Sequence, residues 1–248
     1  WMVKFALIGF GEAGSTFARA GGWKTRATVY DVKADDPADG AAMLAAYADA
    51  GVTGAADLAR VLSGAELVFS LVTADQAQAV AQAAAAHILP GTLYCDMNSV
   101  APDTKQAAAR AIETAGGHYV DVAVMAPVNP GRLAVPLLLS GPRAPDALAK
   151  LTALGFTNAR VVGDQVGRAS TIKMLRSVIN VVATLPQFIK SPESALSSLL
   201  SSATGQGDLL GDLDPSTLAY IVVQGDAGNG KIGLTEAVVQ SPAFAVSA

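Results

Sequence analysis

Residues Phe5 to Ala18 read F-A-L-I-G-F-G-E-A-G-S-T-F-A, and this segment guides the interpretation of the rest of the chain. Its apolar start is typical of a strand buried on both faces of a parallel sheet. Three glycines follow at the spacing G-x-G-x-x-G, and the next residues can open a helix whose N–H groups face a phosphate. Such glycines allow a tight turn, close approach of a pyrophosphate and close helix packing. The candidate cofactor-binding residues of this loop are Gly9, Phe10, Gly11, Glu12, Ala13 and Gly14.

A second apolar segment, residues 27–30, ends at Asp31, about 20 residues after Gly9. An acidic residue at this distance accepts hydrogen bonds from the adenosine ribose hydroxyls of a dinucleotide, which argues against a glycine turn without a ligand. Because its carboxylate repels a 2′-phosphate, Asp31 favours NAD over NADP. Lys33 leaves NADP possible, since a cation two residues later offsets part of that repulsion.

The composition bounds the classes of protein that the chain can belong to. Its 248 residues suffice for one large or two modest domains, and 51% hydrophobic residues with a mean hydropathy of +0.38 indicate ample core. The net charge is −4 without a block of like charge, so we expect neither nucleic acid nor a membrane as a partner. One cysteine and two histidines provide no disulfide framework and no ordinary structural zinc site. The lone cysteine fits a reducing compartment, so we expect a cytoplasmic protein, and no apolar run reaches membrane-spanning length.

Short apolar segments alternate with helical segments through the N-terminal part of the chain. This alternation predicts an α/β fold with a doubly wound, mostly parallel Rossmann sheet. The expected strands are residues 3–8, 27–30, 52–53, 67–72, 92–95, 119–120, 136–140 and 160–162. Beyond the helix of the glycine motif, the expected helices are residues 37–50 with Asp36 as N-cap, 57–62, 75–86, 102–115 and 145–154.

The pattern divides the chain into a dinucleotide-binding domain, residues 1–164, and a C-terminal domain, residues 165–248. The second begins with a long helix after Gly167, in which apolar residues recur at spacings of three and four. We expect this helix to leave the sheet. After about residue 190 serine and glycine become frequent and no single pattern dominates, although residues 191–202 read as a helix and residues 220–223 as a strand.

Polar residues that follow the expected strands are candidates for chemistry, because the site of a doubly wound sheet lies outside the carboxyl ends of its strands. Val72 and Thr73 follow one strand and border the expected nicotinamide position. Capping of the next helix by Thr73 or Asp75 explains this stretch equally well, and the two roles are compatible.

Asn98 and Ser99 follow the next strand and precede a helix whose N-terminus favours anions. They suit a substrate carboxylate or the cofactor amide, although Asp96 and Asn98 can instead shape the turn. Asn129 is the best polar contact in residues 121–129, an otherwise apolar stretch that can form a pocket wall. Turn formation beside the following proline explains Asn129 nearly as well.

Lys173 is the candidate catalytic residue on the helix after Gly167. Partial burial lowers the pKa of a lysine amine and lets it take a proton from a substrate hydroxyl. The alternative is a lysine whose stem packs at an interface while its amine reaches water. Ser177 lies one helical turn later on the same face and is a candidate substrate contact.

Taken in order, these segments resemble the β-hydroxyacid dehydrogenase family, which includes 6-phosphogluconate and 3-hydroxyisobutyrate dehydrogenases. G-F-G-E-A-G-S-T-F-A is similar to its cofactor signature, D-M-N-S-V-A-P-D-T-K to its D-x-N-S-x-x-P segment, and G-R-A-S-T-I-K-M-L-R-S to its catalytic-lysine helix. V-D-V-A-V-M-A-P-V and K-M-L-R-S resemble the phosphogluconate-dehydrogenase-like or threonate-dehydrogenase-like branch. The resemblance covers about residues 3–182. It implies NAD(P)-linked oxidation of a small β-hydroxy or sugar acid, Ser99 as a substrate contact, Lys173 as general acid/base, a helical second domain and a homodimer.

The sequence departs from the family pattern at three places. Met125-Ala126-Pro127 stands where the family has a Ser-Gly-Gly substrate loop, and Ser177 where it usually has asparagine. The residues after about 180 match the expected helical domain poorly. Two alternatives therefore stay open, an NADPH-dependent imine reductase and an NAD(H)-binding module without catalysis.

Overall fold

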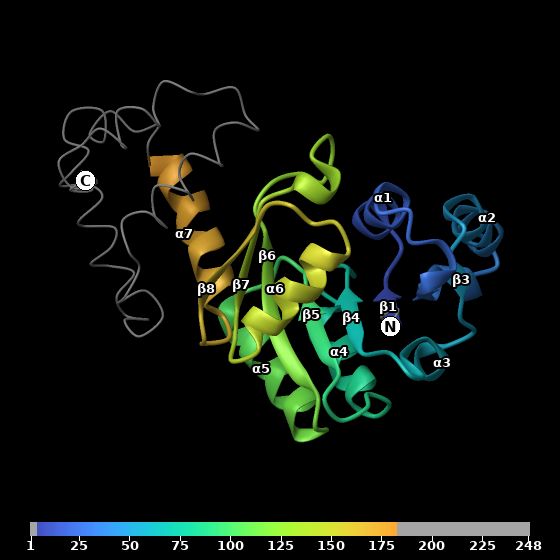
Figure 1. Cartoon of the computed structure of the whole chain (residues 1–248), viewed down its shortest axis with the longest axis horizontal. Coiled ribbons are helices and arrows are strands. Elements are labelled where there is room, and N and C mark those ends of the chain that lie inside the picture. Colours follow the sequence, from blue (N-terminus) through green and yellow to red (C-terminus); the bar gives the residue numbers. More distant parts are fainter. Residues whose placement is uncertain (1–3, 183–248) are drawn as a thin grey trace.

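The computed structural model describes residues 4–182, which form an eight-stranded sheet in the order β3-β2-β1-β4-β5-β6-β7-β8 (Figure 1). Neighbouring strands are parallel except β6 and β7, which are antiparallel. The strands are β1 (Phe5–Ile8), β2 (Ala27–Tyr30), β3 (Thr53–Gly54), β4 (Leu67–Ser70), β5 (Leu93–Asp96), β6 (His118–Val124), β7 (Leu137–Ser140) and β8 (Ala159–Gly163). The helices are α1 (Glu12–Ala20), α2 (Gly40–Ala50), α3 (Leu58–Leu62), α4 (Ala77–Ala85), α5 (Pro102–Thr114), α6 (Ala144–Ala153) and α7 (Arg168–Val182). The predicted α/β class with a mostly parallel, Rossmann-like sheet is confirmed.

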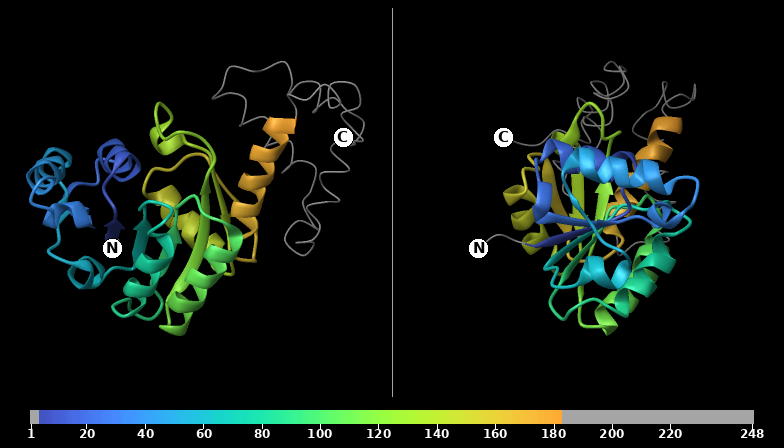
Figure 2. Two further views of the ribbon diagram at one scale, coloured as in Figure 1. Left: turned by 180° about the vertical axis from the view of Figure 1, so that it is seen from behind. Right: turned by 90° about the vertical axis from the view of Figure 1, so that its right-hand side faces the viewer.

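Helices cover both faces of the sheet, as its nearly continuous apolar strands predict. In β1, Phe5 and Leu7 belong to one hydrophobic cluster and Ala6 and Ile8 to another, because successive side chains of a strand point to opposite faces. Residues of α1, α2 and α6 join the first cluster, and residues of α3, α4 and α5 join the second. The right-hand view of Figure 2 shows α6, in yellow, and α5, in green, on opposite sides of the sheet.

Trp23, in the turn after α1, fixes this helix against the sheet. Its ring meets Phe5 edge-on at a centroid distance of 5.0 Å and also packs against Phe69 and Phe156. The indole Nε1 donates to the carbonyl oxygen of Leu154, just after α6, at 3.0 Å. Because a buried indole N–H has a partner here, the ring can pack fully in the core and hold α1 in place.

The start of α2 differs from the sequence prediction. Asp36 does not cap a helix from residue 37; its Oδ1 instead accepts hydrogen bonds from the backbone N–H groups of Ala38 and Asp39, at 2.7 and 3.3 Å, and forms a turn. The helix begins at Gly40. A Cβ there would lie 2.7 Å from the carbonyl oxygen of Ala34, so the chain needs glycine at this close approach.

The path of α7 differs from the expectation that this helix leaves the sheet. Ala169 and Ile172 in its first turns are buried, and the backbone N–H of Ser170 donates to Asp121 of β6 at 2.9 Å. Figure 1 shows α7, in orange, running beside β8. The N-terminal turns of α7 therefore form part of the sheet's cover and bring the lysine helix to the strand ends.

Within residues 4–182, no helix has the length and apolar character needed to span a membrane. The helix expected over residues 191–202 and the strand expected over residues 220–223 lie outside the described residues.

Candidate active site

The glycine turn after β1 has the geometry that its spacing predicts. Gly9 has a φ of +93°, and a Cβ there would lie 2.5 Å from the carbonyl oxygen of Leu71. A Cβ at Gly14 would lie 2.6 Å from the carbonyl oxygen of Gly9. At Gly11 a Cβ would meet no described atom within 4 Å, so the space beside it is open. Two glycines thus serve the turn and the helix packing, while the third leaves room for a pyrophosphate.

The N-terminus of α1 and the end of β2 complete a site that fits a dinucleotide. Within residues 4–182 no side chain caps α1, so the backbone N–H groups of Glu12 and Ala13 in its first turn can face a phosphate. Asp31 Oδ2 accepts a hydrogen bond from the Phe10 N–H at 2.7 Å, and Oδ1 accepts one from the Lys33 N–H at 3.0 Å. These bonds hold the carboxylate beside the loop, where it retains lone pairs for ribose hydroxyls.

Val72 and Thr73 follow β4 beside the glycine turn. The Cβ position at Gly9 is only 3.2 Å from the backbone nitrogen of Val72, so this segment borders the loop. A hydrogen bond from Thr73, with a second from Gln76, lowers the pKa of the exposed Asp75 carboxyl. Thr73 therefore lies in the turn before α4, but neither Thr73 nor Asp75 caps that helix, because Gln76 is the residue before α4 and no side chain among the described residues caps it.

Asn98 follows β5 and presents a buried polar atom to the site. Its backbone N–H donates to Asp96 Oδ1 at 2.8 Å, and its Nδ2 donates to Ser70 Oγ at 3.0 Å. The side-chain Oδ1 is buried and has no hydrogen-bond partner among the described residues. Since leaving such an acceptor unsatisfied costs about 1–3 kcal/mol, a bound donor such as a nicotinamide carboxamide fits there.

Ser99 and Lys173 meet across the site. The Lys173 amine on α7 donates to the Ser99 hydroxyl oxygen at 2.6 Å, although the two residues are far apart in the sequence. Both line a pocket of about 320 Å³, with Asn98 and Ser170 as further polar residues and Ala123 and Met174 among the apolar ones. Burial, and then the positive charges of Lys105 and Arg176, lower the pKa of Lys173 from 10.5 to about 8. About a tenth of this amine is therefore neutral at pH 7 and can accept a proton.

Comparison with known proteins assigns the family. The pattern of the NAD binding domain of 6-phosphogluconate dehydrogenase matches residues 4–141, more than half of the chain. The chain belongs to this family. Membership in this family of NAD binding domains indicates a nicotinamide cofactor, as the sequence resemblance implies. A comparison with curated proteins finds no match.

Solved structures share the fold of this family. A conserved hypothetical protein from Sinorhizobium meliloti 1021 is 31% identical, with a TM-score of 0.68 over 96% of this chain and 86% of that protein. A 3-hydroxyisobutyrate dehydrogenase from Mycobacterium tuberculosis is 15% identical, with a TM-score of 0.60 over 96% of this chain and 91% of that protein. An imine reductase from Streptomyces aurantiacus is 21% identical, with a TM-score of 0.59 over 97% and 92%. The 3-hydroxyisobutyrate dehydrogenase and the imine reductase are less than 25% identical to this chain, so their likeness shows the fold alone.

Not every predicted site residue joins the pocket of this 6-phosphogluconate dehydrogenase-type domain. Asn129, expected as a substrate contact, lies against α1 instead: its Nδ2 is 3.3 Å from Glu12 Oε1 and 3.4 Å from Thr16 Oγ1. The loop between β6 and β7 folds over the first turn of α1 and carries Asn129 to the cofactor side. Ser177 lies on α7 one turn after Lys173, but its side chain is outside the described part of the structure.

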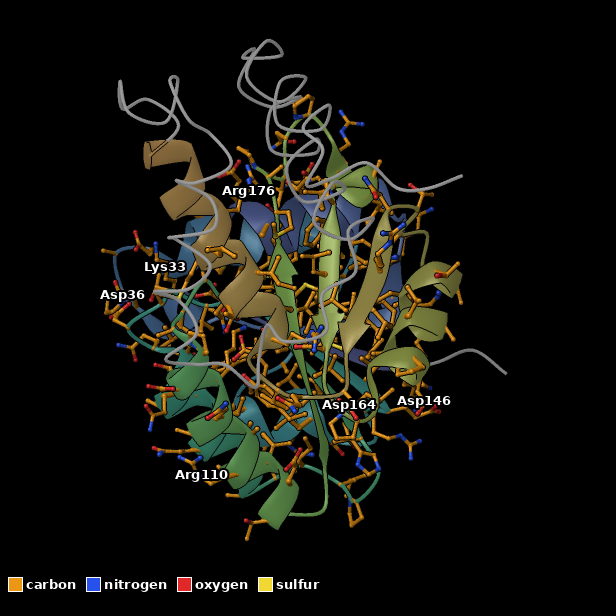
Figure 3. All side chains as sticks on the ribbon, turned by 90° about the vertical axis from the view of Figure 1, so that its left-hand side faces the viewer. Lys33, Asp36, Arg110, Asp146, Asp164 and Arg176 are labelled. Carbon is orange, nitrogen blue, oxygen red and sulfur yellow. The ribbon has the colours of Figure 1, made fainter. Side chains whose placement is uncertain are left out.

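Two cationic residues that the sequence interpretation did not select also belong to this region. Lys105 on α5 is fully buried between Asp96 and Asp121. Arg176 on α7 donates from Nη1 to the carbonyl oxygen of Met125, the residue that follows β6. Figure 3 labels Arg176 beside α7. The spacing contained a signal for Arg176, which follows Lys173 by three residues. For Lys105 it contained none, because a lysine on a helix is normally expected to face solvent.

Proposed function

We propose that the chain is an NAD-dependent dehydrogenase that oxidises a small β-hydroxy or sugar acid, with Lys173 as the general acid/base. The observation that carries the proposal is the 2.6 Å contact between the Lys173 amine and the Ser99 hydroxyl at the wall of the pocket. Ser99 follows the carboxyl end of β5, and Lys173 reaches it from α7. Asn98 lines the same pocket, and its unsatisfied oxygen fits the cofactor amide. A pocket of about 320 Å³ is near the lower end of ligand-site volumes and suits a small molecule.

The chain's own residues bind the reactants and move one proton. The glycine turn and the first turn of α1 would hold the pyrophosphate of a bound cofactor, and Asp31 would accept hydrogen bonds from its ribose hydroxyls. Ser99 and Lys173 receive the substrate hydroxyl, and the neutral Lys173 amine takes its proton while the carbinol carbon gives up a hydride and becomes a carbonyl carbon. When bound, the nicotinamide cofactor supplies the hydride acceptor. The product ketone then leaves or loses carbon dioxide.

Asp31 supports NAD as the cofactor. Its carboxylate is fixed by the N–H groups of Phe10 and Lys33, so it cannot turn away from a 2′-phosphate without losing two hydrogen bonds. The Lys33 side chain is exposed and can approach such a phosphate, which supports NADP as the alternative cofactor.

Arg176 supports an acidic substrate. The family's Ser-Gly-Gly loop is replaced by Met125-Ala126-Pro127, and the Arg176 guanidinium reaches this loop by donating to the carbonyl oxygen of Met125. A guanidinium has five N–H donors in a fork that matches a carboxylate. We propose that Arg176 provides the carboxylate contact that the altered loop lacks.

Binding and turnover of the Lys173→Met protein test the proposed function. We expect NADH to bind this variant as it binds the wild type, while oxidation of hydroxy acids falls by at least 100-fold, the usual contribution of a positioned general base. Wild-type turnover in the variant would contradict the role of Lys173. Absence of turnover by the wild type over a broad hydroxy-acid panel, with normal NADH binding, would favour a non-catalytic binding module.

The altered Met125-Ala126-Pro127 loop favours imine reduction as the second candidate function, since an imine lacks the carboxylate that the usual loop holds. Reduction of cyclic imines with NADPH, together with no oxidation of hydroxy acids, would establish it in place of the dehydrogenase.

A further inference from the structure

A buried charged cluster adjoins the pocket and has no part in the proton transfer described above. Lys105 of α5 has a fully buried side chain, and its Nζ lies 3.0 Å from Asp96 Oδ1 and 3.3 Å from Asp121 Oδ1. The same amine donates to the backbone carbonyl of Asp96 at 2.7 Å. Removing three charged groups from water is costly, and a buried ion pair is by itself weak evidence of a stabilising role. Its contacts with the site give it another role.

The Asp96 side of the cluster shapes the segment that carries Ser99. Asp96 is the last residue of β5, and its Oδ1 accepts the backbone N–H of Asn98 at 2.8 Å. The Tyr119 hydroxyl donates to the other carboxylate oxygen at 2.5 Å. Burial raises the pKa of Tyr119 well above its usual value, so this hydroxyl stays protonated and remains a donor. With both oxygens held, the turn that follows β5 has one orientation, and Ser99 comes next in the chain.

The Asp121 side of the cluster fixes the start of the helix that carries Lys173. Asp121 of β6 accepts from the Ser170 backbone N–H at 2.9 Å and from the Ser170 hydroxyl at 2.8 Å. Ser170 lies three residues before Lys173, one helical turn away on the same face. Lys105 therefore joins the turn after β5 to the first turn of α7, the two backbone segments whose side chains meet in the Ser99–Lys173 contact.

The cluster also acts on the charge of the Lys173 amine. The charged groups that act on it are Lys105 from α5, Asp121 from β6 and Arg176 on α7 itself. Lys105 and Arg176 favour the neutral amine, after burial, which has the largest effect, and Asp121 opposes them. Charges that are shielded from solvent interact more strongly than exposed ones, so removing the charge of Lys105 or Asp121 should shift the pKa of Lys173.

We propose that Lys105 is a positioning residue which, through Asp96 and Asp121, holds Ser99 and Lys173 in register and sets the charge of the Lys173 amine. This inference rests on the proposed function, because the proposed oxidation is the reaction in which the Lys173 amine accepts a proton. It predicts opposite effects of the two buried charges: removal of Lys105 favours the protonated amine, and neutralisation of Asp121 favours the neutral amine. A cluster that only stabilises the fold has no reason to produce opposite effects.

The test is a pH titration of Lys173 by NMR in the full chain, with lysine labelled with carbon-13 at Cε. The Lys173 signal is assigned by its absence in Lys173→Met. We expect Lys105→Met to raise the pKa above about 8, although burial of the amine still keeps it below 10.5, and Asp121→Asn to lower it below about 8. In oxidation assays the pH profile of the rate should shift by the same amount as the pKa of Lys173. At pH 7 a tenfold loss of neutral amine in Lys105→Met should lower the oxidation rate about tenfold.

Tyr119→Phe is the matched control, since it removes a hydrogen bond of the same cluster without removing a charge. Its Lys173 pKa should stay at about 8. An unchanged pKa in both charge variants, shifts in the same direction, or an equal shift in Tyr119→Phe would overturn the proposal. If Lys105→Met does not fold, Asp121→Asn decides alone: a lowered pKa supports the proposal and any other result overturns it. Because the titration reads the amine and not turnover, failure of the proposed function in Lys173→Met would be a separate result.

Discussion

Replacing Lys173 by methionine should stabilise the protein near neutral pH while it removes activity. Burial, and then the charges of Lys105 and Arg176, lower the pKa of the folded-state amine from 10.5 to about 8. Because the unfolded chain binds this proton more tightly, the charged amine destabilises the folded state at every pH below about 8. One pKa unit corresponds to about 1.4 kcal/mol, so the full effect of the fall from 10.5 to about 8 is at most about 3.5 kcal/mol at pH 7. Partial solvent contact of the side chain reduces it further.

The net change in the free energy of unfolding also includes the loss of one interaction. Methionine keeps the length and packing of the lysine stem but removes the hydrogen bond to Ser99, a contribution of roughly 1.5 kcal/mol for a charged donor. About 1 kcal/mol of stabilisation should remain at pH 7, which corresponds to a rise in the melting temperature of roughly 2–4 °C for a chain of this size. The penalty disappears as pH rises from about 8 to 10.5, so the advantage of Lys173→Met should disappear over the same interval.

Thermal denaturation of the wild type and Lys173→Met at pH 7 and near pH 10.5, followed by circular dichroism, measures this difference. Lys4→Met is the matched control, because Lys4 is exposed and its charge should contribute little at either pH. A Lys173→Met protein that is less stable than the wild type at pH 7, or whose advantage persists near pH 10.5, would refute the reasoning from the buried amine.

Three further predictions concern the cofactor and substrate contacts. Asp31→Asn should raise kcat/KM for NADPH relative to NADH by roughly tenfold, because it removes a charge that repels the 2′-phosphate; an unchanged ratio of the two kcat/KM values would place the selectivity elsewhere. Gly9→Ala should lower the melting temperature, because the new Cβ meets the Leu71 carbonyl oxygen at 2.5 Å and φ is +93°, a strain of roughly 1–3 kcal/mol. Gly11→Ala should leave the melting temperature unchanged and weaken NADH binding in calorimetry; equal effects on stability at both glycines would contradict the assignment of their roles. Arg176→Met should raise KM for the hydroxy acid at least tenfold without changing the Kd of NADH, and an unchanged KM would remove Arg176 from the substrate site.

Features determined by neighbours in sequence were predictable. The turn at Gly9 follows from a glycine at the end of an apolar strand, and the position of Asp31 beside it follows from the strand-helix-strand unit. The two faces of β1 follow from the period of two in a strand. The predicted start of α2 was wrong because Asp36 fits a turn as well as a helix cap. The close approach of Gly40 to Ala34 decides between the two, and this approach depends on tertiary packing.

Features that depend on contacts between distant segments were not predictable in the same way. Lys105 belongs to a helix whose other buried positions are apolar, and a lysine there is normally expected to face solvent. Its partners come from β5 and β6, and only the packing of α5 against both strand ends shows why the charge is buried. Asn129 follows a buried strand and reads as a pocket residue, but the loop that carries it folds back to α1.

The pH dependence of kcat/KM for hydroxy-acid oxidation with NAD tests the role of Lys173 in the proposed reaction. The lowered pKa of about 8 predicts that kcat/KM falls tenfold for each unit of pH below about 8, because the protonated amine cannot accept the substrate proton. In the same assay Lys173→Met should show only residual activity without this slope. A wild-type profile that is flat through pH 8, or a Lys173→Met profile that retains both the rate and the slope, would contradict the assignment of Lys173 as the proton acceptor.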